Sequence, residues 1–153
     1  MRSSFEDRLS RAYPGLFPST GRAETDAKIA RIRCGEGWFL IIDMLCGQIQ
    51  NLIESEKLPQ VTIRCIDEKF GRMRVSSEGG SYPVRALIQD AEQSSCRLCE
   101  VCGALGRTLR TDHGWIKTLC THCNVAASDD AKPEDKVKLC STFRVTHQDP
   151  AGK

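Results

Sequence analysis

The chain has 153 residues, of which 40% are hydrophobic and 27% are charged, and nine of them are cysteine. This composition supports a folded core and excludes a wholly disordered chain, while the length suits one compact domain or one domain with a small appendage. No apolar run approaches the ~18 residues of a membrane span. The 22 basic and 20 acidic residues leave a net charge of only +2, far from the basic surplus of a dedicated nucleic-acid binder.

The nine cysteines require an explanation that depends on the cellular compartment. The first residues contain no hydrophobic segment typical of a secretory signal, so we expect a cytoplasmic protein. Cellular reductants keep cytoplasmic thiols reduced, and an odd number of cysteines does not fit a complete disulfide framework. Metal binding is therefore the favoured explanation.

The N-terminal segment predicts a short amphipathic helix that ends before Pro14. Its apolar positions are Phe5, Leu9 and Ala12. Two isolated aromatic residues, Tyr13 and Phe17, are expected to dock onto a core that later segments form.

A long helix is predicted over about residues 38–57, because apolar residues recur there at spacings of three and four. Pro59 ends it. The apolar stripe consists of Trp38, Ile41, Ile42, Leu45, Ile49, Leu52 and Ile53.

Two alternating stretches follow and predict a β-hairpin over about residues 61–76, with its bend near Glu68 and Lys69. The side chains expected on its inward face are Val61, Ile63, Cys65, Met73 and Val75. A second helix is predicted over about residues 83–97, with Ser81 as its cap and Pro83 in its first turn. Its apolar stripe consists of Val84, Leu87, Ile88 and Ala91.

The most specific pattern is Cys99-Glu-Val-Cys102-Gly103 followed by Cys120-Thr-His-Cys123, which has the C-x2-C-x17-C-x2-C spacing of a four-cysteine zinc site. Two residues between thiols let a tight turn direct both sulfurs at one tetrahedral metal ion, and Gly103 relieves crowding beyond the first pair. The intervening residues suffice for the short strands of a ribbon. We therefore predict a closed structural zinc site whose ligands are Cys99, Cys102, Cys120 and Cys123.

The other cysteines and one histidine leave alternatives open. Cys96 precedes Cys99 at the same spacing and His122 lies inside the second pair, so either is a reserve ligand. Cys46 and Cys65 are expected to be small buried hydrophobic residues. Two cysteines stay without an assigned role, Cys34 and Cys140.

A nuclease is one alternative function. Asp112-His113 between two CxxC pairs is similar to a zinc-stapled HNH nuclease, in which a histidine activates water beside a catalytic metal. Only six residues separate His113 from Cys120, too few for the strand and loop of that nuclease hairpin, and the next histidine after Cys123 is His147. We therefore favour an exposed turn for His113 and expect no enzymatic activity.

A DNA- or RNA-binding regulator is a second alternative, because basic residues on the predicted hairpin and ribbon can contact phosphates. These residues are Arg64, Arg72, Arg74, Arg107, Arg110 and Lys117. Such clusters are more often solvated faces paired with nearby acids, for which Asp67, Glu68 and Glu100 are available.

Five segments, in this order, resemble a group of uncharacterised small zinc-ribbon proteins from phages, prophages and proteobacteria. The segments are GEGWF at 35–39, IDEKFGRMR at 66–74, AEQSS at 91–95, CEVCG at 99–103 and GWIKTLC at 114–120. In that group the last metal ligand is often histidine, and Cys123 takes its place here. The resemblance implies a phage-type accessory protein, and such proteins often act by binding and blocking a host machine.

Together these patterns predict an α+β fold in which helices pack on a small antiparallel sheet, followed by a C-terminal four-cysteine zinc ribbon. We expect an α+β domain at 1–95, a zinc-ribbon module at 96–125 and a polar tail at 126–153, with a late strand at 137–145. The predicted function is that of a non-enzymatic zinc-binding accessory protein that binds and modulates or inhibits a host or defence protein complex in the host cytoplasm.

Overall fold

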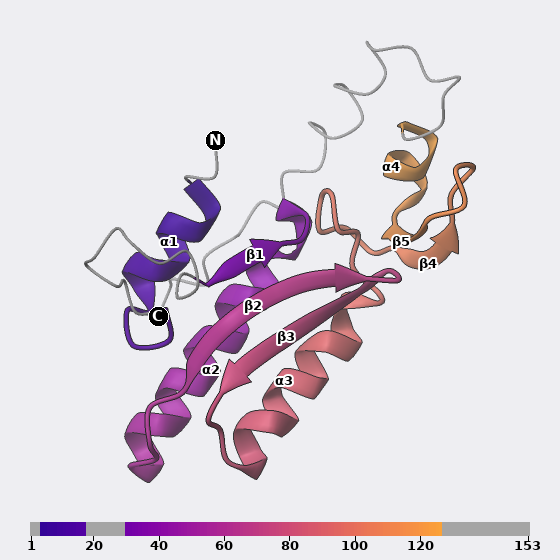
Figure 1. Ribbon diagram of the computed structural model, residues 1–153. Helices are drawn as coiled ribbons and strands as arrows, with labels where there is room; N and C mark the ends of the chain where they lie inside the picture. Colours follow the sequence, from indigo (N-terminus) through magenta and orange to yellow (C-terminus); the bar gives the residue numbers. More distant parts are fainter. Residues whose placement is uncertain (1–3, 18–29, 127–153) are drawn as a thin grey trace, which may run out of the picture.

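Two sheets of different size organise the part of the chain that the computed structural model describes, residues 4–17 and 30–126 (Figure 1). A three-stranded sheet has the order β1-β2-β3, and a two-stranded sheet pairs β4 with β5. The elements are α1 (Ser4–Ala12), β1 (Arg31–Arg33), the 3-10 turn η1 (Glu36–Trp38), α2 (Phe39–Glu56), β2 (Thr62–Lys69), β3 (Arg72–Glu78), α3 (Tyr82–Ser95), β4 (Arg107–Arg110), β5 (Ile116–Leu119) and α4 (Thr121–Ala126). The predicted α+β class is confirmed. The predicted strand at 137–145 and the tail beyond Ala126 lie outside the described residues.

The predicted hairpin is present as β2 and β3, which pair antiparallel. Its two-residue turn is Phe70-Gly71, where both residues have positive φ (53° and 76°), the backbone of a type I′ turn. The turn therefore falls just after the expected bend at Glu68 and Lys69. The sheet also contains β1, which pairs parallel with β2 and which no pattern predicted, because three residues are too few to show alternation.

A shift in the strand register explains one wrong prediction. Val61 and Ile63 are buried as expected, but the register shifts between Ile63 and Cys65. Such a bulge reverses the inward and outward positions that follow it. Ile66 therefore enters the core, and Cys65 is only half-buried instead of being a buried hydrophobic residue.

The two long helices lie side by side against one face of the three-stranded sheet (Figure 1). The apolar stripe of α2 is buried with Trp38 at its start, and α2 ends where Lys57 adopts a left-handed backbone (φ 51°). Ser81 takes the predicted cap position of α3, and its carbonyl accepts the first helical hydrogen bond, from Arg85 N–H (3.1 Å), but its hydroxyl makes no capping hydrogen bond. Both helix predictions are confirmed, and the stripes of α2 and α3 supply much of one continuous core.

The N-terminal helix is present as predicted, and this segment packs on the core. Leu9 and Leu16 are fully buried, and Phe17 is nearly so. The carbonyl of Leu16 accepts a hydrogen bond from Ile63 N–H (2.8 Å), which ties this segment to β2. Tyr13 is half-buried, and its hydroxyl donates to the carbonyl oxygen of Asp43 on α2 (3.1 Å).

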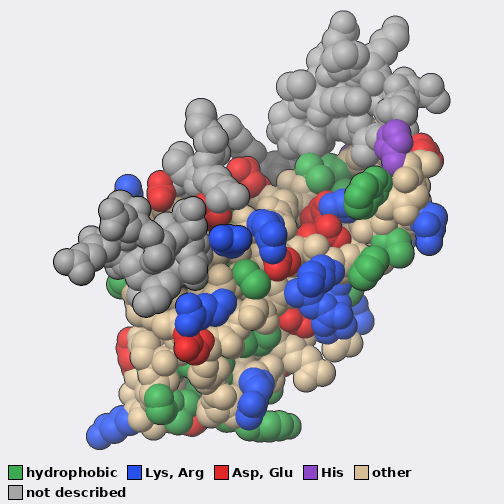
Figure 2. Space-filling view, in the orientation of Figure 1, with side chains coloured by type: hydrophobic (Ala, Val, Ile, Leu, Met, Phe, Trp, Pro, Cys, Tyr) green, Lys and Arg blue, Asp and Glu red, His purple; other side chains and the backbone are tan. Residues whose placement is uncertain are grey.

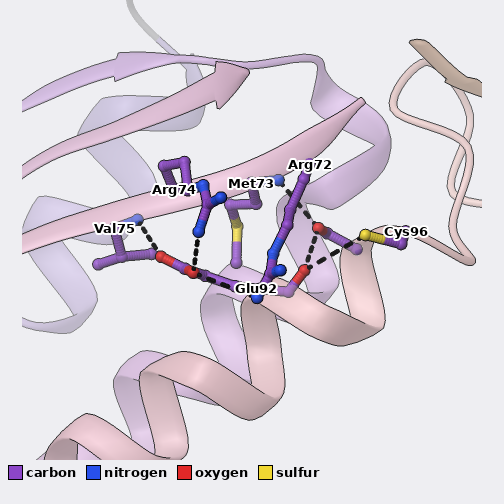
Figure 3. Close-up of polar contacts among 7 residues, drawn as sticks. Arg72, Met73, Arg74, Val75, Glu92 and Cys96 are labelled. Carbon is purple, nitrogen blue, oxygen red and sulfur yellow. Dashed lines mark hydrogen bonds and ion pairs between the residues drawn. The ribbon is translucent and has the colours of Figure 1, made fainter. Parts of the chain in front are cut away.

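Polar side chains from neighbouring helices bind backbone amides at both edges of the sheet. At the β3 edge, Met73 N–H donates to Ser95 Oγ and Val75 N–H to Glu92 Oε1, both at 2.9 Å (Figure 3). At the β1 edge, Ile32 N–H donates to Glu6 Oε1 (3.2 Å). These bonds occupy edge amides that would otherwise be available to pair with another strand.

The basic residues of the hairpin pair with different acids from those expected. Arg72 and Arg74 both approach Glu92 Oε2, at 3.6 and 3.2 Å (Figure 3), and Arg64 pairs with Glu78. Arg72 and Arg74 reach across to α3 rather than along the hairpin. Of the expected acids, Glu68 and Glu100 pair with Lys117, as the sequence allowed for that residue. Asp67 pairs with Arg33 of β1 (2.7 Å).

Candidate metal centre

Four thiols from two separate CxxC pairs converge at the C-terminal end of the described chain. The sulfur atoms of Cys99, Cys102, Cys120 and Cys123 all lie within 4.8 Å of one another. Four sulfurs at the usual Zn–S distance of ~2.3 Å would be ~3.8 Å apart in a tetrahedron, and the Cys102 and Cys120 sulfurs are 3.6 Å apart. A disulfide would need ~2.0 Å. The spacing of the thiols therefore fits a shared metal ion and excludes a disulfide between these two residues.

Tight local structure brings each pair of cysteines together. In the first pair, Gly103 has a φ of 78° and its N–H donates to the carbonyl of Cys99 (2.8 Å), which closes the turn that we call the knuckle, residues 99–103. In the second pair, Cys120 lies between β5 and α4, and Cys123 lies in the first turn of α4. The N–H of Cys123 donates to the sulfur of Cys120 (3.4 Å). The predicted role of Gly103 beyond the first pair is thus confirmed.

The predicted ribbon is also present. The strands β4 and β5 pair antiparallel between the two cysteine pairs, from Arg107 opposite Leu119 to Arg110 opposite Ile116. We use the name ribbon for residues 96–126 and the name body for the described residues before them. Cys99, Cys120 and Cys123 are buried with Leu119 in a small cluster of their own, and Cys102 is half-buried.

Protonation of the cluster is uneven. Burial raises the pKa of Cys102 to about 11. Burial acts in the same direction on Cys120, but the N–H of Cys123 and the neighbouring thiols outweigh it, and the pKa of Cys120 is lowered. Thiolates are soft ligands that suit zinc, and a four-sulfur set leaves no position for a water molecule on the metal. The arrangement can therefore hold a metal ion, and its chemistry is that of a structural site.

The reserve ligands do not join the cluster. The only described group of three or more potential metal ligands is the four predicted cysteines. Cys96 lies at the end of α3 and approaches the carbonyl oxygen of Glu92 (3.9 Å; Figure 3), and His122 is exposed on α4. Cys96 is kept away because α3 continues to Ser95 and its last turn carries Cys96, so the tight turn begins only at Cys99.

The remaining described cysteines belong to the body. Cys46 is fully buried, as predicted. Burial raises the pKa of Cys34 to about 12, with further contributions from three carboxylates, and burial raises that of Cys46 to about 12. Neither thiol belongs to the cluster of four. Cys140 lies outside the described residues.

His113 is exposed at the turn between β4 and β5, as expected from the sequence. The turn is closed by Gly114 N–H, which donates to the carbonyl of Thr111 (2.8 Å). Within the described chain, no cluster of potential metal ligands includes His113. The arrangement of an HNH nuclease, with a second metal beside this histidine, therefore has no support in the described residues.

Two glycines of the body form the surface on which the knuckle packs. A Cβ atom on Gly37 would lie 2.6 and 2.7 Å from the backbone nitrogens of Gly103 and Cys102, and one on Gly35 would lie 2.8 Å from the carbonyl carbon of Glu100. Gly37 N–H donates to the carbonyl of Glu100 (2.9 Å). Backbone meets backbone here, so neither glycine can carry a side chain without separating the two parts.

Trp38 completes this contact. Its side chain is fully buried, and its indole Nε1–H donates to the carbonyl of Leu98 (2.8 Å). The sequence patterns gave the glycines before Trp38 no structural role, although both lie in the resemblance segment at 35–39. The available signal was the combination of two glycines with a tryptophan, which indicates a close backbone approach beside a buried aromatic ring.

The tip of the β2–β3 hairpin makes a second contact with the ribbon. Thr118 Oγ1 donates to the carbonyl of Gly71 (2.5 Å). Lys117 Nζ bridges Glu68 Oε2 (3.0 Å) and Glu100 Oε1 (2.8 Å). Burial raises the pKa of Glu100, while Lys117 acts in the opposite direction. Lys117, which the sequence offered as a phosphate contact, is thus engaged in the interface.

We call these two contacts together the seam. On the body side it consists of residues 35–38 and 68–71, and on the ribbon side of residues 98–103 and 117–118. The four thiols lie directly beside it, because the knuckle supplies both Cys99 and Cys102 to the cluster and its backbone to Gly37. Metal binding and docking of the ribbon therefore share the same turn.

The chain matches no protein-family model, and comparisons with curated proteins and with solved structures find no significant similarity. None of the described helices has both the length and the apolar character needed to cross a membrane.

Proposed function

We propose that the protein is a non-enzymatic zinc-binding accessory protein of the phage type, which binds and modulates or inhibits a host or defence protein complex. The convergence of four thiols within 4.8 Å carries the first half of this proposal. A closed set of four thiolates stabilises a fold without offering an open coordination position. In this proposal the metal stabilises the fold of the ribbon, and the protein surface binds the partner.

The resemblance to phage and prophage proteins supports the second half. Four of its five segments, at 35–39, 66–74, 99–103 and 114–120, contribute residues to the seam or the thiol cluster. Most of the motifs thus describe one structural unit rather than separate sites. The absence of an activity assigned to that group leads us to propose binding as the mode of action.

Binding of DNA or RNA ranks second, because most of the candidate basic residues already have acidic partners. Arg64, Arg72 and Arg74 pair with Glu78 or Glu92, and Lys117 pairs within the seam. Figure 2 shows basic side chains interspersed with acidic ones on the face in view. A phosphate-binding surface requires a local excess of positive charge. A fall of nucleic-acid affinity with increasing salt would nevertheless promote this alternative.

Metal analysis tests the first half. We expect purified full-length protein to contain about one zinc ion per chain, because the four thiols form one site. The Cys120→Ser variant should lose it, and the Cys96→Ser variant should retain it, since Cys96 lies outside the cluster. Zinc far below one equivalent in the wild-type protein would refute the zinc site.

Affinity capture tests the second half. Zinc-loaded protein is immobilised and exposed to lysates of candidate bacterial hosts, with a chelator-treated sample as the control. We expect a stoichiometric host protein that is retained by the loaded form. Recovery of no such partner across hosts, combined with salt-dependent binding of nucleic acid, would favour the regulator instead.

A further inference from the structure

An open groove of about 560 Å³ runs between α2 and α3 on the side of these helices that the sheet does not cover. Its walls are largely aliphatic, with Leu40 and Met44 contributed by α2, and Leu87 and Ala91 by α3. The knuckle closes one end, where Cys102 and Gly103 line it. The groove therefore lies next to the thiol cluster, and its shape depends on the turn that the metal would hold.

The apolar wall on α2 is exposed to an unusual degree. Leu40 is 58% and Met44 57% exposed, although both belong to a helix whose opposite face is the core. They are four residues apart and therefore adjacent on one helix face. Contiguous exposed aliphatic residues beside a groove are typical of a protein-binding site, and methionine adapts readily to different partners.

The charges at the groove have one sign. Glu36 and Asp90 are exposed and line it, and its lining contains no Lys, Arg or His. Within the described residues neither carboxylate forms an ion pair. Arg97 lines a shallower hollow that adjoins the groove at Asp90. An apolar floor with unpaired carboxylates at its rim complements a ligand that is apolar on one side and basic beside it.

The surrounding architecture favours a helical ligand over an extended one. An extended peptide would add to the edge of a sheet, but polar side chains already bind the edge amides of Ile32, Met73 and Val75. Two neighbouring helices, by contrast, present ridges and a groove against which a third helix packs. The site is therefore suited to helix-in-groove recognition.

We propose that the groove between α2 and α3 binds an amphipathic helix of a partner protein, which buries aliphatic side chains against Leu40 and Met44 and places Lys or Arg beside Glu36 and Asp90. This inference rests on the proposed protein-binding function and specifies its partner class.

Two designed peptides test the proposal directly. Each is a fluorescein-labelled amphipathic helix of about 18 residues, or five turns, with the same leucine face, and the polar face is lysine in one and glutamate in the other. Titration with zinc-loaded full-length protein, followed by fluorescence anisotropy, should show at least ~10-fold tighter binding of the lysine peptide, equivalent to ~1.4 kcal/mol. Equal binding of both peptides would overturn the proposal.

Variants assign the binding to the groove. The double variant Leu40→Asp/Met44→Asp should weaken binding of the lysine peptide by at least ~10-fold. Trp115→Asp is the matched control, because Trp115 is also apolar and 69% exposed but does not line the groove. The double variant Glu36→Lys/Asp90→Lys should reverse the preference toward the glutamate peptide. An equal loss of binding in the Trp115 control would show nonspecific adhesion and refute the site.

A measurement on the wild-type protein removes any dependence on how the variants fold. Amide chemical shifts of isotope-labelled protein, recorded with and without the lysine peptide, should change along α2, α3 and the knuckle. Changes confined to the exposed face of the three-stranded sheet would refute the groove. Concentration-dependent dimerisation that Leu40→Asp/Met44→Asp abolishes, and that the peptide does not displace, would identify a second copy as the occupant and likewise refute the proposal.

The outcome separates this inference from the proposed function. A captured host protein that binds Leu40→Asp/Met44→Asp as well as it binds the wild type would leave the proposed function standing and refute the groove. Selective peptide binding at the groove, together with no zinc in the purified protein, would support the groove and refute the proposed zinc protein.

Discussion

The body and the ribbon differ in what their interiors are made of. The body encloses a continuous cluster of aliphatic and aromatic side chains that includes Trp38, Leu45 and Ile49. The buried cluster of the ribbon consists of Leu119 and three cysteines, with Cys102, Ala104 and Leu109 packed against it. Burial of apolar area can stabilise the first, whereas the second has too little apolar area to fold on that basis.

The body and the ribbon therefore have separate sources of stability, although they share an interface. In the zinc site that we propose, binding of the ion would contribute on the order of 10 kcal/mol, as it does in small domains, which is ample for a ribbon of this size. The seam then determines whether metal binding stabilises the ribbon alone or also the body. It joins the knuckle to Gly37 through backbone contacts, the carbonyl of Leu98 to the indole of Trp38, and the hairpin tip to the ribbon through Gly71 and Thr118.

Loss of a cysteine ligand should produce the largest effect and should fall mainly on the ribbon. In Cys120→Ser, we expect amides of β4 and β5 to lose protection from hydrogen exchange, because on the order of 10 kcal/mol of metal-binding free energy is removed. Amides of α2 should stay protected, except near Trp38, whose indole donates to the carbonyl of Leu98 just before the knuckle. Cys96→Ser is the matched control and should leave exchange unchanged. Equal loss of protection throughout α2 would show that the two parts fold as one cooperative unit.

A cavity in the body should have the next largest effect and should leave metal content intact. Ile49 is fully buried in α2, so Ile49→Ala should lower the free energy of unfolding by about 2–5 kcal/mol. Urea denaturation followed by circular dichroism measures this change. Met44→Ala in the same helix is the control, because Met44 is exposed and its truncation should cost less than ~0.5 kcal/mol. A reduced zinc content in folded Ile49→Ala protein would contradict the separation of the two sources of stability.

The features that sequence could predict were those with a local signature. Helical periodicity located α2 and α3, alternation located the hairpin, and the spacing of two CxxC pairs located all four clustered thiols. Each of these patterns involves residues that lie close together in the sequence. The CxxC pattern is informative because the spacing of ligands is fixed by the metal that they share.

What sequence could not predict depends on contacts between distant segments. The bulge that exposes Cys65 arises from pairing with β3, and β1 is recognisable only through its partner β2. The ion-pair partners could not be predicted for the same reason, since Arg72 and Arg74 pair with Glu92 on α3, which is distant in the sequence. Seam residues such as Gly37 carry no chemical signature, and their role is visible only once the knuckle is in place.

A methyl group inside the seam should separate the parts without touching either core. In Gly37→Ala the new Cβ would meet backbone atoms of the knuckle, which cannot rotate away, so we expect a loss of about 1–3 kcal/mol. Gly47→Ala is the matched control, because Gly47 lies inside α2 with only Tyr13 Oη at 3.4 Å, and alanine there should stabilise by about 0.5–1 kcal/mol. Thermal unfolding measures both. A stabilised Gly37→Ala variant would show that the knuckle does not dock as described.

The ion pairs of the seam should give the smallest effect, but one that distinguishes an interface from a solvated surface. Lys117→Met keeps the aliphatic stem and removes the charge that lies between Glu68 and Glu100, so two carboxylates are left without their cation. Glu100 is only 7% exposed, and we expect a loss of about 1–2 kcal/mol in urea denaturation. Arg64→Met is the matched control, because the Arg64–Glu78 pair is largely exposed and its loss should cost less than ~1 kcal/mol.

A second substitution shows whether this loss comes from the stranded charge. Adding Glu100→Gln to Lys117→Met removes the buried carboxylate charge, so part of the lost stability should return, and the double-mutant cycle should give a coupling energy above ~0.5 kcal/mol. Equal losses in Lys117→Met and Arg64→Met, with no recovery in the double variant, would mean that the pairs at the seam behave like those on an open surface. Docking of the ribbon on the body would then rest on the backbone contacts at Gly37 and on the hydrogen bond from Thr118 to Gly71.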